Sequence, residues 1–206
     1  LPKNGQLGCW LNLQNAVAIH AIVQDGKKSR SLKKLRGTAE APGKLWTKPR
    51  VTVAGQNLSL HDIETNLLTE FDNPNVIYGI YQGVRGAPSL SPTAYRGSNV
   101  EQKLAENAKQ YINSKGVVSV KNDVVRVTPV FSWYQNKVFG QNDAALKDHL
   151  SAYAAPKLKT KLSAGKSFKT SSLNYRIDSY TPPVASGDYA AATSGNAGAR
   201  SGGYGS

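Results

Sequence analysis

The chain has 206 residues, of which 39% are hydrophobic, and this is enough to bury a core in one or two globular domains. It carries 26 Lys and Arg against 13 Asp and Glu, so its net charge of +13 favours anionic partners. One cysteine excludes an internal disulfide, no Cys/His spacing fits a structural zinc site, and no apolar stretch approaches the roughly 20 residues of a membrane-spanning helix.

The first residue is Leu1, and the sequence contains no methionine. We therefore expect either a processed product, from which a signal peptide has been removed, or a fragment. Removal of a signal peptide predicts a periplasmic or extracellular protein.

The first part of the chain alternates helix and strand signals. Helix formers with apolar residues at helical spacing predict a buried helix over residues 7–24, closed by Gly26. Residues 50–54 alternate as a short strand does. Ser59 and Asp62 have the spacing of a helix cap, and apolar residues follow through position 68.

The apolar run at 76–81 predicts a buried strand, and a Gly- and Pro-rich loop follows at 82–92. Such loops often carry the functional site of a protein with mixed helices and strands. The remaining predicted elements are a helix at 99–114, a hairpin of strands 117–120 and 124–128, helices at 131–139 and 142–153, and a strand at 173–180.

These elements predict a single α+β domain over residues 1–181, with a small, mainly antiparallel sheet packed by helices. Residues 182–206 form a low-complexity tail in which 16 of 25 residues are Gly, Ala or Ser. In isolation, such a composition is flexible. Tail-mediated self-association, giving a homo-oligomer or a filament, is one expectation for this segment.

The positive charge is concentrated in two segments. Residues 27–50 hold nine basic residues and one acidic residue, and residues 157–176 hold six basic residues and no acidic one. Lysine and arginine commonly form solvated faces, and few aromatic residues accompany these for base stacking. The alternative is binding of an acidic partner or polyanion, for which the candidates are Lys27, Lys28, Arg30, Lys33, Lys34, Arg36, Lys157, Lys159 and Lys161.

Few residues have a pattern suited to catalysis. The three histidines are 41 and 88 positions apart, which is not the spacing of a helical metal pair. We expect His20 to be a hydrogen-bonded core residue, His61 and His149 to be solvated, and Cys9 to be a buried, inert thiol. The sequence therefore predicts no catalytic residue, no metal and no cofactor.

Four motifs in order resemble the family called domain of unknown function 547. They are CWLNLQNA at 9–16, GQNLSLHDIE at 55–64, the segment 77–90, and FSWY at 131–134, with a similar terminal strand near 175–178. The family typically has histidine in place of Thr65 and Ile77, arginine in place of Thr69 and Asn75, and cysteine in place of Gln82 and Ala87. All six positions are substituted in this chain.

Cysteine, histidine and arginine gathered at these six positions could supply an activated nucleophile. The resemblance therefore implies that this chain lacks that nucleophile. Asn12, Asn15 and Glu64 are retained, and hydrogen bonds from them can tie the long helix to the loop. If the family is enzymatic, this member is expected not to be.

Three functional hypotheses follow. The first is a non-catalytic, basic binding or structural subunit. The second is a hydrolase or transferase acting at the 82–92 loop, with Ser89 or Ser91 in the pocket, and the third is a binder of nucleic acid or another polyanion. Candidate residues for a loop pocket are Asn12, Asn15, Glu64, Gln82, Arg85 and Ser89.

Overall fold

The computed structural model describes residues 1–26, 28–38 and 40–178. Within these ranges the first elements are α1 (Lys3–Ala21), η1 (Ile22–Gly26), α2 (Lys33–Arg36), α3 (Lys44–Thr47), β1 (Pro49–Val53), β2 (Gln56–Ser59), α4 (Leu60–Glu70) and η2 (Pro74–Tyr78). They are followed by α5 (Val100–Ile112), β3 (Val118–Lys121), β4 (Val124–Val127), α6 (Pro129–Val138), α7 (Asp143–Tyr153), α8 (Pro156–Ala164) and β5 (Ser167–Thr170).

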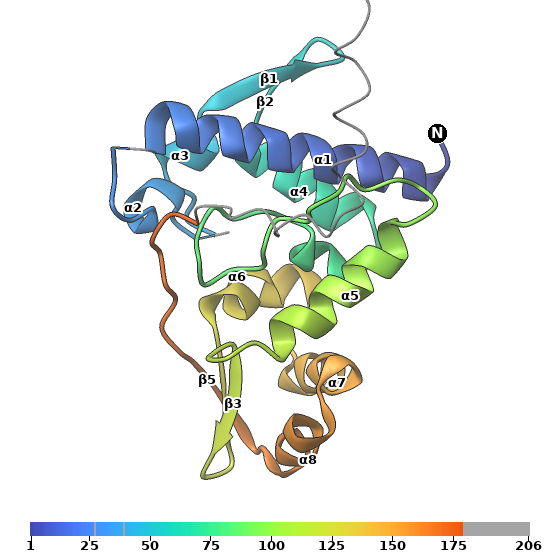
Figure 1. The fold of residues 1–206 in the computed structure, drawn as a ribbon, viewed down its shortest axis with the longest axis vertical. Helices are drawn as coiled ribbons and strands as arrows, with labels where there is room; N and C mark the ends of the chain where they lie inside the picture. The colour runs from blue at the N-terminus through green and yellow to red at the C-terminus, as the bar shows by residue number, and fades with distance from the viewer. Residues whose placement is uncertain (27, 39, 179–206) are drawn as a thin grey trace, which may run out of the picture.

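Helix α1 runs across the upper part of the molecule, with the β1–β2 hairpin above it (Figure 1). Its inner side buries Leu7, Leu11 and Ala18, and it packs on α4 and α5. The helix predicted over 7–24 is confirmed, although it begins four residues earlier and its last turn widens into the π-helical η1.

Helix α4 begins where the sequence predicts. The Ser59 hydroxyl accepts a hydrogen bond from the Asp62 N–H at 3.2 Å, and the Asp62 carboxylate accepts one from the Ser59 N–H at 2.8 Å. This reciprocal cap satisfies two donors that the first helical turn leaves without partners. The helix then buries Leu60, Ile63 and Leu67 in the core.

The strands of the described residues form two small sheets, β1–β2 and β3–β4–β5. Both hairpins are antiparallel, and β5 joins β4 in parallel after the chain passes through α6, α7 and α8. Asn122 and Asp123 have φ values of 51° and 58°, as a two-residue turn matching the strand twist requires. The predicted α+β fold with a mainly antiparallel sheet is confirmed.

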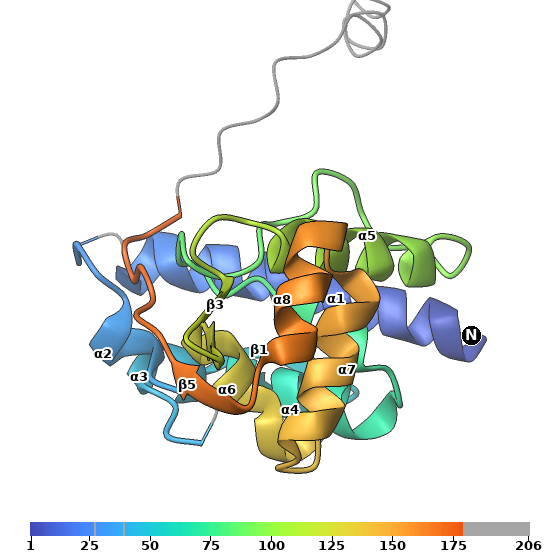
Figure 2. The same ribbon diagram turned by 90° about the horizontal axis from the view of Figure 1, so that it is seen from below.

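Two strand predictions are wrong. Residues 74–78 form the 3₁₀ helix η2, which Asn73 caps by accepting a hydrogen bond from the Asn75 N–H at 2.8 Å. Within the described residues the last strand is β5 (Ser167–Thr170), several residues before the predicted 173–180 segment, of which the structure describes residues 173–178. Helix α8 was not predicted, and it lies beside the three-stranded sheet at the lower end of the molecule (Figures 1 and 2).

The buried side chains form one apolar cluster that extends from Leu7 to Leu162. At its centre, Gly79 has no space for a side chain, since a Cβ would lie 2.6 Å from Leu104 and 2.9 Å from Leu11. The loop after η2 therefore starts where α1 and α5 meet. Across the described ranges, none of the helices is both long and apolar enough to span a membrane. The predicted tail at 182–206 lies outside the described residues.

Candidate binding pocket

Two asparagines of α1 hold both ends of the loop segment between η2 and α5. Asn15 donates to the Gly79 carbonyl at 3.0 Å and accepts from the Tyr81 N–H at 2.9 Å. One turn earlier, Asn12 donates to the Tyr95 carbonyl at 2.8 Å and accepts from the Tyr95 N–H at 2.9 Å. Each amide thus satisfies a peptide donor and acceptor, and this is the tie between helix and loop that the sequence predicts.

The segment 171–178, which we call the C-terminal strap, holds the same loop from the other side. The N–H groups of Arg85 and Gly86 donate to the carbonyls of Arg176 and Asn174, each at 3.1 Å. On the far side of the strap, the Leu32 N–H donates to the Tyr175 carbonyl at 2.9 Å. Gly86 is required here, because a Cβ would lie 2.7 Å from the Asn174 nitrogen.

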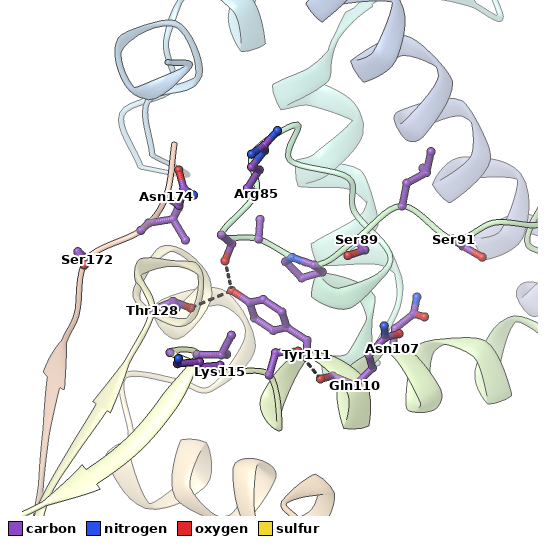
Figure 3. Close-up of a pocket in the computed structure, with 18 of the residues that line it drawn as sticks. Arg85, Ser89, Ser91, Asn107, Gln110, Tyr111, Lys115, Thr128, Ser172 and Asn174 are labelled. Atoms are coloured by element: carbon purple, nitrogen blue, oxygen red, sulfur yellow. Dashed lines mark hydrogen bonds between the residues drawn. The ribbon is translucent and has the colours of Figure 1, made fainter. Parts of the chain in front are cut away.

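A cavity of about 610 Å³ opens between the loop, the end of α5 and the C-terminal strap. Figure 3 shows Tyr111 between these walls, with Arg85 and Lys115 on opposite sides of it. The polar residues that line this loop pocket are Arg85, Ser89, Ser91, Asn107, Gln110, Tyr111, Ser114, Lys115, Thr128, Ser172 and Asn174.

Hydrogen bonds fix the floor of the pocket. The Tyr111 hydroxyl donates to the Gly86 carbonyl at 2.8 Å and lies 2.9 Å from the Thr128 hydroxyl (Figure 3). Burial raises the pKa of Tyr111, so the phenol stays neutral. The pocket wall is therefore a set of hydroxyl and amide groups with two cationic side chains, and none of the described residues lining it is Asp, Glu, His or Cys.

A second polar cluster lies inside the protein, away from the pocket. Arg36 forms an ion pair with Glu64 at 3.6 Å, and their side chains are 0% and 3% exposed. The Arg36 Nε donates to the Gln82 side-chain oxygen at 2.8 Å. The Tyr134 hydroxyl donates to Glu64 Oε1 at 2.8 Å, and Trp46 Nε1 donates to Glu64 Oε2 at 2.9 Å.

Aromatic rings enclose this cluster. The Arg36 guanidinium carbon lies 4.0 Å from the ring centroid of Trp133 and 5.1 Å from that of Trp46. Burial, and then the negative charge of Glu64, raise the pKa of Tyr134 well above its usual value. The cluster joins α2, α4 and α6 to Gln82 at the start of the loop. Because its charges are paired and hydrogen-bonded, it stabilises the position of the loop rather than offering a reactive group.

The predicted pocket residues therefore separate into two groups. Arg85 and Ser89 line the loop pocket, as does Ser91. The candidates Asn12, Asn15, Glu64 and Gln82 do not line it, and they hold the loop from within the protein instead. The sequence offers little signal for the other residues that line the pocket, because they come from separate segments. Lys115 lies in the turn after α5, and Asn174 lies in the C-terminal strap.

Histidine and cysteine lie elsewhere, and three of these predictions are wrong. His20 and Cys9 are exposed on the outer side of α1. His149 is largely buried, with Nε2 2.9 Å from the Tyr78 hydroxyl and its ring stacked on that of Tyr78. His61 is half-buried at the start of α4. Among the described residues there is no group of three or more His, Cys, Asp or Glu that could hold a metal ion.

The candidate polyanion-binding residues occupy two separate regions, since α2 and α8 lie in opposite halves of the molecule (Figure 1). Arg36 is fully buried and paired, which corrects its assignment to a polyanion surface. Lys27 lies outside the described residues. The other seven are exposed: Lys28, Arg30, Lys33, Lys34, Lys157, Lys159 and Lys161.

The fold and the pocket together define an α+β domain with a polar, cationic cavity, one wall of which is formed by the C-terminal strap. Residues 1–112 match the family described as "Protein of unknown function, DUF547", and the chain belongs to this family. The matched residues cover α1 to α5 and the loop, whereas the strap lies beyond them. No curated protein and no solved structure matches the chain.

Proposed function

We propose that this protein is a non-catalytic binding domain that takes a small anionic, hydroxyl-bearing ligand in the loop pocket. The observation that carries the proposal is the composition of the wall. Arg85 and Lys115 supply positive charge, and serine, asparagine and glutamine side chains supply neutral donors and acceptors. This combination fits a carboxylate or phosphate attached to a polyhydroxylated skeleton.

The volume of about 610 Å³ is in the range of small-molecule sites, and it suits a sugar acid better than a long polymer. The lining is more polar than that of pockets for apolar cofactors. A hydroxylated anion would use the amides of Gln110 and Asn174 and the hydroxyl of Ser89 as hydrogen-bonding partners.

The placement of Glu64 argues against the hydrolase or transferase alternative. Ser89 and Ser91 line the pocket, but the described lining residues include no carboxylate or imidazole to accept a proton from either hydroxyl. Glu64 is 2% exposed, and both of its oxygens accept hydrogen bonds from Tyr134 and Trp46. It is therefore engaged within the buried cluster.

Titration of the ¹⁵N-labelled full chain with glucuronate, glucose and inorganic phosphate tests this proposal. Glucuronate is expected to shift amide resonances of residues 85–92 and 114–116, and glucose is expected to shift them much less. Phosphate distinguishes recognition of any anion from recognition of a hydroxylated one. Equal shifts with glucose and glucuronate, or none in these segments at millimolar glucuronate, would refute the assignment.

Lys115→Gln provides the matching variant. Removing one charge-assisted contact from an exposed side chain should weaken glucuronate binding by about fivefold, equivalent to about 1 kcal/mol. Lys121→Gln is the control, because Lys121 is also exposed but lies in β3, outside the pocket. Equal weakening by both variants would indicate a general effect of net charge.

Two further parts of the functional hypothesis rest on sequence alone. Residues 182–206 lie outside the described residues, so self-association through them stays a prediction. The mass of the native particle, measured with and without this tail, would test it. A periplasmic or extracellular location likewise stays a prediction.

A further inference from the structure

Strand β3 forms one edge of the β3–β4–β5 sheet. The Thr128 N–H donates to the Val117 carbonyl at 3.1 Å, so this pair is hydrogen-bonded across the hairpin. Bonded and non-bonded pairs alternate in an antiparallel ladder. The peptide groups of Val118 and Val120 therefore point away from β4, and no described residue forms a hydrogen bond with them.

A groove of about 250 Å³ lies between this strand and α8. Val118, Val120 and Leu158 provide its apolar surface, and Lys157 and Lys161 line it one helical turn apart. Neither lysine forms an ion pair with another described residue. The groove thus combines an apolar floor with two cations beside a strand edge whose Val118 and Val120 peptide groups have no hydrogen-bond partner among the described residues.

The opposite face of the sheet is also cationic at this edge. Ser119 and Lys121 are exposed there, and Arg126 lies opposite Ser119 on β4. Lys169 of β5 neighbours Arg126 in the parallel ladder, so two like charges are adjacent. Like charges on neighbouring strands repel each other, and an anionic group close to this face relieves the repulsion.

We propose that the β3 edge binds an acidic segment of another protein in extended conformation, as an added strand. The peptide groups of Val118 and Val120 pair with its backbone. Its side chains alternate between the two faces, so apolar residues enter the groove and acidic residues lie towards Lys121 and Arg126. Lys157 and Lys161 attract further acidic residues at the ends of the segment.

Charge decides the identity of the partner. Pairing of β3 with β3 of a second copy would bring together two sets of lysines, and this repulsion opposes the contact. The chain's own tail at 182–206 contains one acidic and one basic residue, so it lacks the required negative charge. An acidic strand from a different protein has the complementary charge.

A fluorescently labelled peptide of alternating valine and glutamate, added to the full chain, provides the test by anisotropy. Binding should slow hydrogen exchange at the amides of Val118 and Val120. The same peptide with its central residue replaced by proline should bind at least about tenfold more weakly, since proline has no N–H to donate to a β-sheet hydrogen bond. The double variant Lys157→Glu/Lys161→Glu should lose at least about tenfold in affinity.

Lys159→Glu is the matched control, because Lys159 is exposed on the same helix but does not line the groove. This variant should leave the affinity within about twofold of that of the unmodified protein, because salt screens the interaction of a more distant exposed charge with the peptide. All the substituted lysines are exposed, so the variants should keep their fold, which circular dichroism would check.

Three results would overturn the proposal. If polyglutamate without apolar residues binds as tightly as the alternating peptide, the region is a general polyanion surface. If the proline-containing peptide binds equally well, no strand is added. If Lys159→Glu weakens binding as much as the double variant does, the groove does not specify the contact.

Discussion

Removal of the charge of Glu64 tests the role of the buried cluster that positions the loop. In Glu64→Gln the side chain keeps its shape, but Arg36 becomes a fully buried cation without its anionic partner. Breaking a buried pair in this way costs about 3–5 kcal/mol of unfolding free energy. In the unmodified protein, Tyr134 and Trp46 donate to different oxygens of Glu64. Glutamine has one oxygen in place of these two, so it can accept a hydrogen bond from only one of the two donors.

The second effect adds to the first, because a buried donor without an acceptor costs about 1–3 kcal/mol. The two costs are not additive, and we expect a total of about 4 kcal/mol. This is a large share of the roughly 5–15 kcal/mol that stabilise a typical domain. For a chain of about this size it corresponds to a decrease in melting temperature of about 10 °C.

Urea unfolding followed by both circular dichroism and tryptophan fluorescence measures the change. Glu70→Gln is the control, since Glu70 is an exposed residue of the same helix and should change stability by less than about 0.5 kcal/mol. Adding Arg36→Met to Glu64→Gln should cost less than the sum of the single changes, because no charge is then stranded. If Glu64→Gln falls within about 1 kcal/mol of Glu70→Gln, the cluster is not desolvated as argued.

Two other variants test the packing around the loop and the core. Burial lowers the pKa of His149 from 6.5 to about 4, so the unfolded chain binds the proton more tightly than the folded one. Up to about 3 kcal/mol of unfolding free energy should be present above pH 6.5 and be lost as the pH falls towards 4. Unfolding of His149→Phe, measured across this pH interval, should lack that loss. Identical dependence of stability on pH in the variant and the unmodified protein would contradict the lowered pKa of His149. In Gly43→Ala the new Cβ would lie 2.3 Å from the Leu35 carbonyl oxygen and displace the connection that carries Arg36, so we expect a loss of at least about 2 kcal/mol. Gly55→Ala is its control in thermal unfolding, because a Cβ at Gly55 meets no atom within 4 Å and only the positive φ of 82° opposes it. Gly43 has an ordinary φ of −81°, so a loss in Gly43→Ala no larger than that in Gly55→Ala would contradict the crowding at Leu35.

The elements that the sequence predicts well are those with a local physical signal. The cap at Ser59 and Asp62 fixes the start of α4, and the turn at Asn122 and Asp123 fixes the β3–β4 hairpin. Residues 76–81 gave the wrong element because an uninterrupted apolar run fits either a buried strand or a buried helix. Pro74 after Asn73 was the local signal for a helix start.

Parts of the site could not be predicted because they depend on contacts between distant segments. The sequence predicts a tie from Asn12 and Asn15 to the loop, but only the fold shows that their partners are Tyr95 and Gly79, at the two ends of the loop. Likewise, nothing local distinguishes Arg36 from the exposed lysines near it, although it alone of the described basic candidates is enclosed by Trp46 and Trp133. Tertiary packing, and not the charge pattern, separates these residues.

The C-terminal strap has a consequence for how the protein is made. Ser172 and Asn174 complete the wall of a pocket whose loop is synthesised about 80 residues earlier. A nascent chain can fold α1, α4 and α5 around the loop while that wall is still absent. The pocket can therefore form only after nearly the whole described chain has left the ribosome, so a prematurely terminated product would lack the pocket even if its helices were packed.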